Sequence, residues 1–74
     1  MEGSVMSDHV YKQITLTGSS STSSDDAIRR AIAKAGETVR GMHWFEVLET
    51  RGYITGSTVE HWQVTIRVGF KLDD

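Results

Sequence analysis

The stretch STVEHWQVTIRVGFKL, residues 57–72, decides the fold. Successive side chains of a strand point to opposite faces of a sheet, so strict alternation predicts one long strand with an apolar face and a polar face. The predicted apolar face carries Trp62, Val64, Ile66, Val68, Phe70 and Leu72. The predicted polar face carries His61, Gln63, Thr65, Arg67, Gly69 and Lys71. At roughly 3.3 Å per residue this strand would extend about 50 Å.

Residues 42–54, MHWFEVLETRGYI, predict a second strand immediately before it. Simple alternation places two apolar side chains, Phe45 and Val47, on one face. The other face then carries Trp44, Glu46, Leu48 and Thr50. The intervening TGS, residues 55–57, is typical of a hairpin turn, so the two strands should pair antiparallel.

The N-terminal part predicts a further strand and a helix. In residues 9–17, HVYKQITLT, the apolar face holds Val10, Ile14 and Leu16, with Lys12 as the one exception. Residues 18–24, GSSSTSS, form a serine-rich connector that lacks the GK[ST] signature of a phosphate-binding loop.

The helix should begin at Ser23 or Ser24, where a hydroxyl can cap free N–H groups and the next two residues are acidic. Apolar residues then recur at helical spacing, at Ala27, Ile28, Ala31, Ile32, Ala35 and Val39. Gly41 is expected to end the helix. The fold class is therefore α+β, with the order β-α-β-β and a three-stranded antiparallel sheet around one helix.

A chain of 74 residues permits one domain, which we place at residues 8–74, with residues 1–7 as an N-terminal extension. Its first five residues, MEGSV, are interpreted as an added or alternative start. Such a short chain buries only about 60% of its unfolded surface, and it has no Cys for disulfides. The last strand is also far longer than the expected helix of about 25 Å, so part of its apolar face should pack against other chains.

Charge and motifs exclude several function classes. A net charge of −2 disfavours nucleic acid as a partner, and no apolar run predicts a signal or membrane segment. The absence of Cys fits a cytoplasmic location. His9, His43 and His61 lack metal-ligand spacing. Without Cys, GxSxG or a placed acid–base pair, the sequence gives no support for catalysis.

Four side chains are candidates for ligand binding, each with a structural alternative. Trp44 is a large ring on a polar face, which fits either a subunit interface or aromatic stacking on a ligand. Gln63 offers a donor and an acceptor to a heteroaromatic edge, or is simply solvated. Arg51 and Lys71 could meet an anionic tail or form surface ion pairs, with Glu46 and Glu49 as possible partners.

Four segments together resemble the dodecins, with the similarity covering residues 10–73. They are VYKQITLTGSS, DDAIRRAIAKA, HWFEVLETRGYI and WQVTIRVGFKL. The resemblance implies a sheet curled around its helix and twelve copies in a hollow sphere of cubic symmetry. It implies flavins bound in pairs at two-fold axes, between indoles matching Trp44, with an amide matching Gln63 at the ring edge.

The same resemblance implies further ligand contacts. FMN is the expected cofactor, with riboflavin or related flavins as alternatives, and the site extends to Phe45 and Glu46 in the motif that begins at Trp44. Arg51 and Lys71 would contact the phosphate or ribityl group, although Lys71 stands where Arg is common. Coenzyme A is a further possible ligand, for which the bases are Arg29, Arg30, Lys34 and Lys12.

The function implied is storage, sequestration and photoprotection of flavin without enzymatic turnover. Two alternatives remain open on sequence grounds. One is a structural scaffold in which Trp44 serves an interface, and the other is a flavin-dependent enzyme, for which two flavins stacked between indoles leave little room for a substrate.

Overall fold

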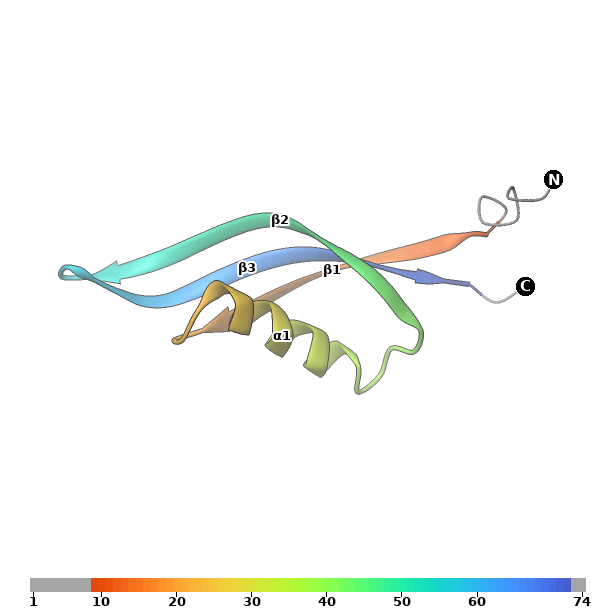
Figure 1. Cartoon of the computed structure of the whole chain (residues 1–74), viewed down its shortest axis with the longest axis horizontal. Coiled ribbons are helices and arrows are strands. Elements are labelled where there is room, and N and C mark those ends of the chain that lie inside the picture. Colours follow the sequence, from red (N-terminus) through yellow and green to blue (C-terminus); the bar gives the residue numbers. More distant parts are fainter. Residues whose placement is uncertain (1–8, 73–74) are drawn as a thin grey trace.

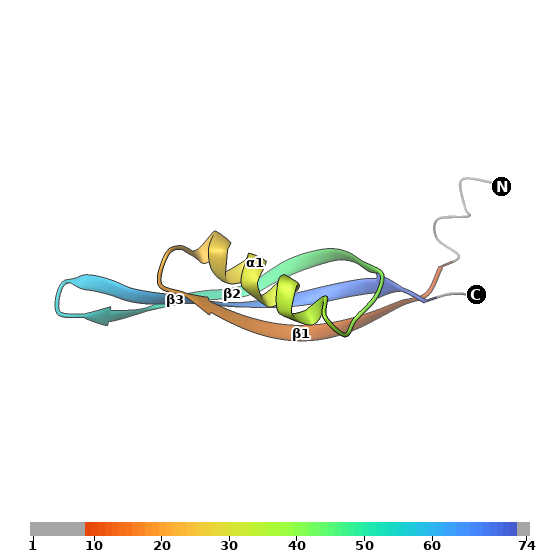
Figure 2. The same ribbon diagram turned by 90° about the horizontal axis from the view of Figure 1, so that it is seen from below.

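The computed structural model describes residues 9–72. Its elements are β1 (Tyr11–Ser20), α1 (Ser24–Ala35), β2 (Met42–Thr55) and β3 (Thr58–Lys71). All pairing is antiparallel, and β3 lies in the middle of the sheet in the order β1-β3-β2. The helix lies against one side of this sheet (Figures 1 and 2). The β-α-β-β prediction is confirmed; the proposed extension at residues 1–7 lies outside the described residues.

The core lies between α1 and the even-numbered positions of β3. Val64 and Ile66 are fully buried and Val68 nearly so, and the small residues of the helix, Ala27 and Ala31, pack against them. Full burial of each such aliphatic side chain contributes roughly 1.5–3 kcal/mol. The alternating apolar residues predicted for the last strand are thus the residues that pack the helix against the sheet.

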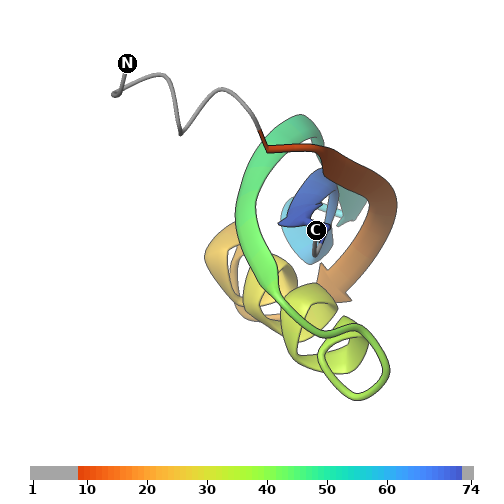
Figure 3. The same ribbon diagram turned by 90° about the vertical axis from the view of Figure 1, so that its right-hand side faces the viewer.

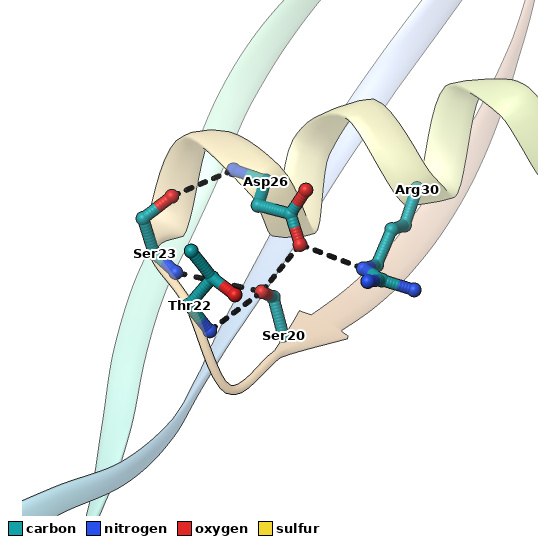
Figure 4. A network of polar contacts seen from close by, with 5 residues as sticks. All are labelled: Ser20, Thr22, Ser23, Asp26 and Arg30. Carbon is teal, nitrogen blue, oxygen red and sulfur yellow. Dashed lines mark hydrogen bonds and ion pairs between the residues drawn. The ribbon is translucent and has the colours of Figure 1, made fainter.

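The start of the helix is organised by a hydroxyl on the preceding strand (Figure 4). β1 continues to Ser20, so the first three residues of the predicted serine-rich connector belong to the strand. The buried Ser20 hydroxyl donates to Asp26 Oδ2 at 2.6 Å and accepts from the backbone N–H of Thr22 at 2.9 Å. Ser23 caps the helix by accepting from the Asp26 N–H at 3.0 Å.

Gly18 explains why the connector begins later than predicted. A Cβ at Gly18 would overlap the carbonyl oxygen of Ala27 and the methyl of Ala31. The strand therefore passes directly beneath the helix at this point, where only glycine fits.

The predicted end of the helix at Gly41 is wrong, because α1 ends at Ala35 with Gly36 as its cap. Beyond Gly36 the backbone closes tighter turns, with Glu37 N donating to Lys34 O at 3.2 Å and Thr38 N to Ala35 O at 3.1 Å. Glycine is a poor helix former, and β-branched residues follow it. Gly41, with a φ of 76°, instead turns the chain into β2.

The alternation predicted for the second strand is interrupted by irregularities in its pairing with β3. Register shifts fall between Met42 and Trp44 and between Val47 and Glu49. After the second shift, Thr50 pairs with Val64 on the helix side. The prediction that Thr50 shares the face of Trp44 and Glu46 is therefore wrong, because a β-bulge exchanges which residues point outward.

The β2–β3 hairpin extends well beyond the helix, as Figure 1 shows. β1 ends where Ser20 pairs with Trp62, so residues 53–61, here called the arm, have only two strands. The arm turns at Gly56, with a φ of 64°, which agrees with the predicted hairpin turn. The chain measures 58 × 24 × 14 Å along its principal axes. Seen from its end, β1 and β2 curve away on either side of β3 (Figure 3).

Candidate ligand-binding site

The face of the sheet turned away from α1, here called the outer face, carries most of the predicted ligand residues. Directly paired residues on neighbouring strands share a face. From β3 this face takes His61, Gln63, Thr65, Arg67, Gly69 and Lys71. Their partners on β2 are Tyr53, Arg51, Glu49, Glu46 and Trp44. Their partners on β1 are Ser19, Thr17, Thr15, Gln13 and Tyr11.

Trp44 lies across Gly69. The two residues are paired in the register, and a Cβ at Gly69 would overlap the ring atoms of the indole. Gly69 is buried while Trp44 remains half-buried in the isolated chain. The indole therefore packs directly on the backbone of Gly69. A side chain at residue 69 would occupy the same space as the indole.

Arg51 and Gln63 are directly paired farther along the same face. The Arg51 guanidinium donates to Glu49 Oε2 at 2.6 Å, and this bond, followed by one to Tyr53, raises the pKa of Arg51. Half-exposed ion pairs of this kind contribute little to stability but fix the direction of the guanidinium. Gln63 thus sits beside an oriented positive charge.

Glu46 pairs with Arg67 rather than with either base considered for it from the sequence. Its Oε1 lies 3.5 Å from Arg67 Nη1, directly across the β2–β3 pairing. Next along the face, the Thr17 and Thr65 hydroxyls are hydrogen-bonded at 3.0 Å. The middle of the outer face, between Trp44 and Gln63, is therefore a polar surface whose charged and hydroxyl groups are largely paired with one another.

A hollow of about 320 Å³ lies at the end of the face beyond Trp44, lined by His9, Tyr11, His43 and Lys71. Tyr11 pairs with Lys71, and the Tyr11 and His43 rings are parallel within 5°, with centroids 6.0 Å apart. No carboxylate is among the four residues that line it. This end of the face thus gathers nitrogen and hydroxyl groups from the ends of three elements of the chain.

Within residues 9–72, no three side chains of His, Asp or Glu come together as ligands for a metal ion. The one helix in this range is too short and too polar to cross a bilayer.

The helix carries three of the four bases considered for coenzyme A, and two of these three are engaged locally. Arg30 Nε donates to Asp26 at 2.7 Å, and Lys34 Nζ lies 3.5 Å from Glu37. Both belong to the exposed side of α1, on the opposite side of the sheet from Trp44. Arg30 and Lys34 are therefore already paired with acidic side chains of the same chain.

Comparison with known proteins matches this arrangement to one family. The family model described as Dodecin covers residues 10–73. The chain belongs to the dodecin family. Dodecins are flavin-binding proteins that assemble as oligomers.

Similar dodecins come from different bacteria. The dodecin of Thermus thermophilus is 43% identical over 65 residues, which cover 88% of this chain and 94% of that protein. The structure of a dodecin from Streptomyces davaonensis superposes with a TM-score of 0.82 at 42% identity, covering 90% of this chain and 98% of that one. The structure of dodecin from Streptomyces coelicolor gives 0.83 at 40% identity, with 93% and 99% covered.

Five of the six ligand residues expected from the dodecin resemblance share the outer face, but they are not all adjacent. These five are Trp44, Glu46, Arg51, Gln63 and Lys71. Phe45 lies on the other face, paired with Val68 beside the helix. Trp44 is level with Gly69, so Gln63 is six positions away along β3, about 20 Å.

Sequence reasoning did not include Gly69, Tyr11 or His43 in the site. A lone Gly within a strand pattern signals a close approach, and this signal could have identified Gly69. Tyr11 and His43 gave no such signal, because they meet only through the pairing of β1 with β3 and the irregularity before Trp44.

Proposed function

We propose that this dodecin binds FMN, with riboflavin as a weaker ligand, and that it stores and shields the flavin without turnover. The observation that carries the proposal is the indole of Trp44 resting on Gly69, on a face that also holds Gln63 and Arg51. A flat aromatic ligand needs a ring to stack on and polar groups at its edge, and this face offers both.

The donor set fits a flavin. The Gln63 amide can donate to a ring carbonyl and accept from a ring N–H, which are the groups at the pyrimidine edge of a flavin. The charged groups between Trp44 and Gln63 are paired with one another, as in Glu46 with Arg67, so they do not oppose a neutral ring. With a flavin bound, the Trp44 indole stacked on its ring would be placed to quench the light-excited ring by electron transfer.

The spacing within the chain favours a site shared between subunits. An indole and an amide about 20 Å apart along one strand are too far apart to hold one ring at close range. We therefore infer that the Trp44 and the Gln63 that contact a given flavin belong to different chains. Two-fold symmetry then gives two equivalent indoles on either side of a flavin pair, because each chain presents the same surface to the other.

Self-association also agrees with the surface of the isolated chain. The arm exposes Tyr53, Ile54 and Val59, and Ile54 is 73% exposed. A two-stranded hairpin is at best marginally stable alone in water, so the arm needs a covering surface. Phe45 and Val47, at the uncovered edge of the helix side, are also exposed. We propose that about twelve copies cover these residues mutually in a closed cytoplasmic particle.

The test replaces each tryptophan in turn. Trp44→Leu keeps apolar bulk over Gly69 but removes the aromatic face, whose stacking contributes roughly 1–3 kcal/mol. FMN affinity, measured by quenching of flavin fluorescence, should fall about 5- to 150-fold. Trp62→Leu is the matched control on the helix side of β3. The folded fraction of this variant should bind FMN with the affinity of the parent. Equal affinities for Trp44→Leu and the parent would refute the stacking proposal.

A scaffold role would give a different outcome for the same variants. If Trp44 served only to join subunits, Trp44→Leu would dissociate the particle, as measured by light scattering, and the parent would not quench FMN. Dissociation together with strong FMN quenching by the parent would instead place Trp44 in both roles.

A further inference from the structure

The rings of Tyr53 and His61 stack on the outer face at the base of the arm. The two residues are directly paired in the β2–β3 register, and their ring centroids are 4.6 Å apart, with the planes inclined by 24°. β1 does not extend to this level, because its last pair is Ser20 with Trp62. The stack therefore belongs to β2 and β3 alone, and it lies one step beyond Gln63 on the same face.

The Arg51 guanidinium lies between two side chains that fix its direction. Glu49, Arg51 and Tyr53 share the outer face of β2, each about 7 Å from the next along the strand. On one side the guanidinium donates to Glu49 Oε2 at 2.6 Å. On the other side a hydrogen bond to Tyr53 adds to the effect of Glu49 in raising the pKa of Arg51. The Tyr53 ring, held by its stack on His61, therefore restricts the positions open to the guanidinium.

Gln63 by itself cannot satisfy the pyrimidine edge of a flavin. That edge presents one N–H between two carbonyl oxygens, whereas the edge of a side-chain amide offers one N–H and one oxygen. The amide can pair with the ring N–H and one carbonyl, which leaves the second carbonyl without a donor.

Arg51 is placed to supply that missing donor. It is directly paired with Gln63, and the Cβ atoms of such pairs lie about 4.5–5.5 Å apart. Ser19, the partner of Gln63 on β1, offers only a short, neutral hydroxyl. Hydrogen bonds from a charged donor are about twice as strong as neutral ones, so the guanidinium is the more effective donor beside the amide.

We propose that Tyr53, stacked on His61, is a positioning residue that holds the Arg51 guanidinium against the flavin ring. Arg51 then donates to the carbonyl that Gln63 leaves free. The proposal rests on the flavin-binding function proposed above and adds Tyr53 and His61 to that site. Arg51 and Gln63 belong to the same chain, so they reach the ring together whichever subunit supplies the indole. A contact with the ring affects FMN and riboflavin equally, because the two ligands share it.

A double-mutant cycle tests whether Tyr53 acts through Arg51. Affinities for FMN and riboflavin are measured by fluorescence quenching for the parent, Tyr53→Phe, Arg51→Met and the double variant. Tyr53→Phe keeps the ring and its stack but removes the hydroxyl. Arg51→Met should lower both affinities about tenfold or more, and Tyr53→Phe should lower both about two- to fivefold. In the Arg51→Met background, Tyr53→Phe should cause no further loss.

Two control variants remove the same groups elsewhere in the chain. Thr55→Val removes another hydroxyl of the arm, one that donates to Glu60 Oε1 at 3.0 Å. Arg40→Met removes an equal charge from a guanidinium that donates to Gly36 O at 3.0 Å, at the end of the helix. Neither control should change either affinity. A loss in Thr55→Val as large as that in Tyr53→Phe would contradict a specific role for the Tyr53 hydroxyl.

His61 provides a second test that leaves Tyr53 and Arg51 in place. His61→Phe keeps an aromatic ring for the stack, so this variant should bind both flavins as the parent does. His61→Ser leaves the Tyr53 ring without that contact, so both affinities should fall, by no more than in Arg51→Met. Equal affinities for His61→Phe and His61→Ser would contradict a role for the stack.

The outcomes separate this proposal from the one on which it rests. The positioning role is wrong, while flavin binding stands, if Tyr53→Phe binds both flavins like the parent. It is also wrong if the loss in Tyr53→Phe persists in the Arg51→Met background, which would place Tyr53 itself against the ligand. A loss in Arg51→Met that is confined to FMN would overturn the ring contact. If neither flavin binds to the parent, the flavin-binding function itself fails.

Discussion

The two faces of β3 differ in what they contact: one packs against the helix, and the other remains accessible. On the helix side Val64, Ile66 and Val68 are buried against small residues of α1, and nothing polar interrupts them. On the outer face Gln63, Arg67 and Lys71 alternate with them and remain accessible. Alternation with a period of two thus lets one strand build the core and present the proposed ligand groups, so changes on one face should act separately from changes on the other.

The largest effect expected is the loss of a core side chain. Ile66→Ala leaves a cavity beneath α1, and such truncations typically cost about 2–5 kcal/mol in unfolding free energy. Urea unfolding at fixed protein concentration measures it. Thr65→Ala, one residue away on the outer face, should cost well under half as much. Similar losses for the two variants would mean that the faces are not separate.

Two glycines test the difference between the faces, because each leaves room for a different neighbouring group. Gly18→Ala would push against the backbone of α1, and Gly69→Ala would push against the indole of Trp44. Overpacking of a fitted contact costs about 1–3 kcal/mol, so Gly18→Ala should lower stability by that amount and spare FMN affinity.

Gly69→Ala should show the reverse pattern. The indole is a side chain that can rotate away, so stability should fall less than in Gly18→Ala while FMN affinity drops. The two variants are compared by urea unfolding and by FMN titration. A Gly69→Ala protein that binds FMN like the parent would show that the position of Trp44 on Gly69 is not needed for binding.

The smallest effect concerns the polar network at the helix start. The Ser20 hydroxyl, and after it Arg30, lowers the pKa of Asp26 (Figure 4). A lowered folded-state pKa means that the stabilisation is present at pH values above the ordinary one, about 3.9, and is lost as the pH falls through the lowered value. Asp26→Asn should therefore be less stable than the parent at pH 7, and this difference should shrink below about pH 4.

Urea midpoints at pH 7 and pH 3 measure this difference. Asp25→Asn is the control, since Asp25 lies in the same helical turn but makes none of the hydrogen bonds drawn in Figure 4. If Asp25→Asn showed the same pH dependence as Asp26→Asn, the effect would belong to the acidic helix start in general and not to the Ser20 bond.

Local pattern predicted the element order, the core face of β3 and the hairpin turn, because each depends on residues close together in the chain. It failed where two elements meet. Gly36 ends the helix before Gly41, and the irregularities at Trp44 and Leu48 reverse which side chains point outward. The pairing places Trp44 and Gln63 on one face, but their separation along β3 depends on pairing that the sequence does not display.

The hollow around Lys71 was the least predictable feature. Its members come from β1, β2 and β3 and from the residue before β1, and no spacing within the sequence joins them. Only the register that pairs Tyr11 with Lys71 brings them together.

Titration of FMN fluorescence with the parent protein tests the proposal that the outer face binds flavin between indoles of an oligomer. Light scattering on the same samples gives the number of chains. We expect strong quenching that saturates near one flavin per chain, in a particle of about twelve chains. Unquenched FMN emission in the presence of an intact particle would contradict it.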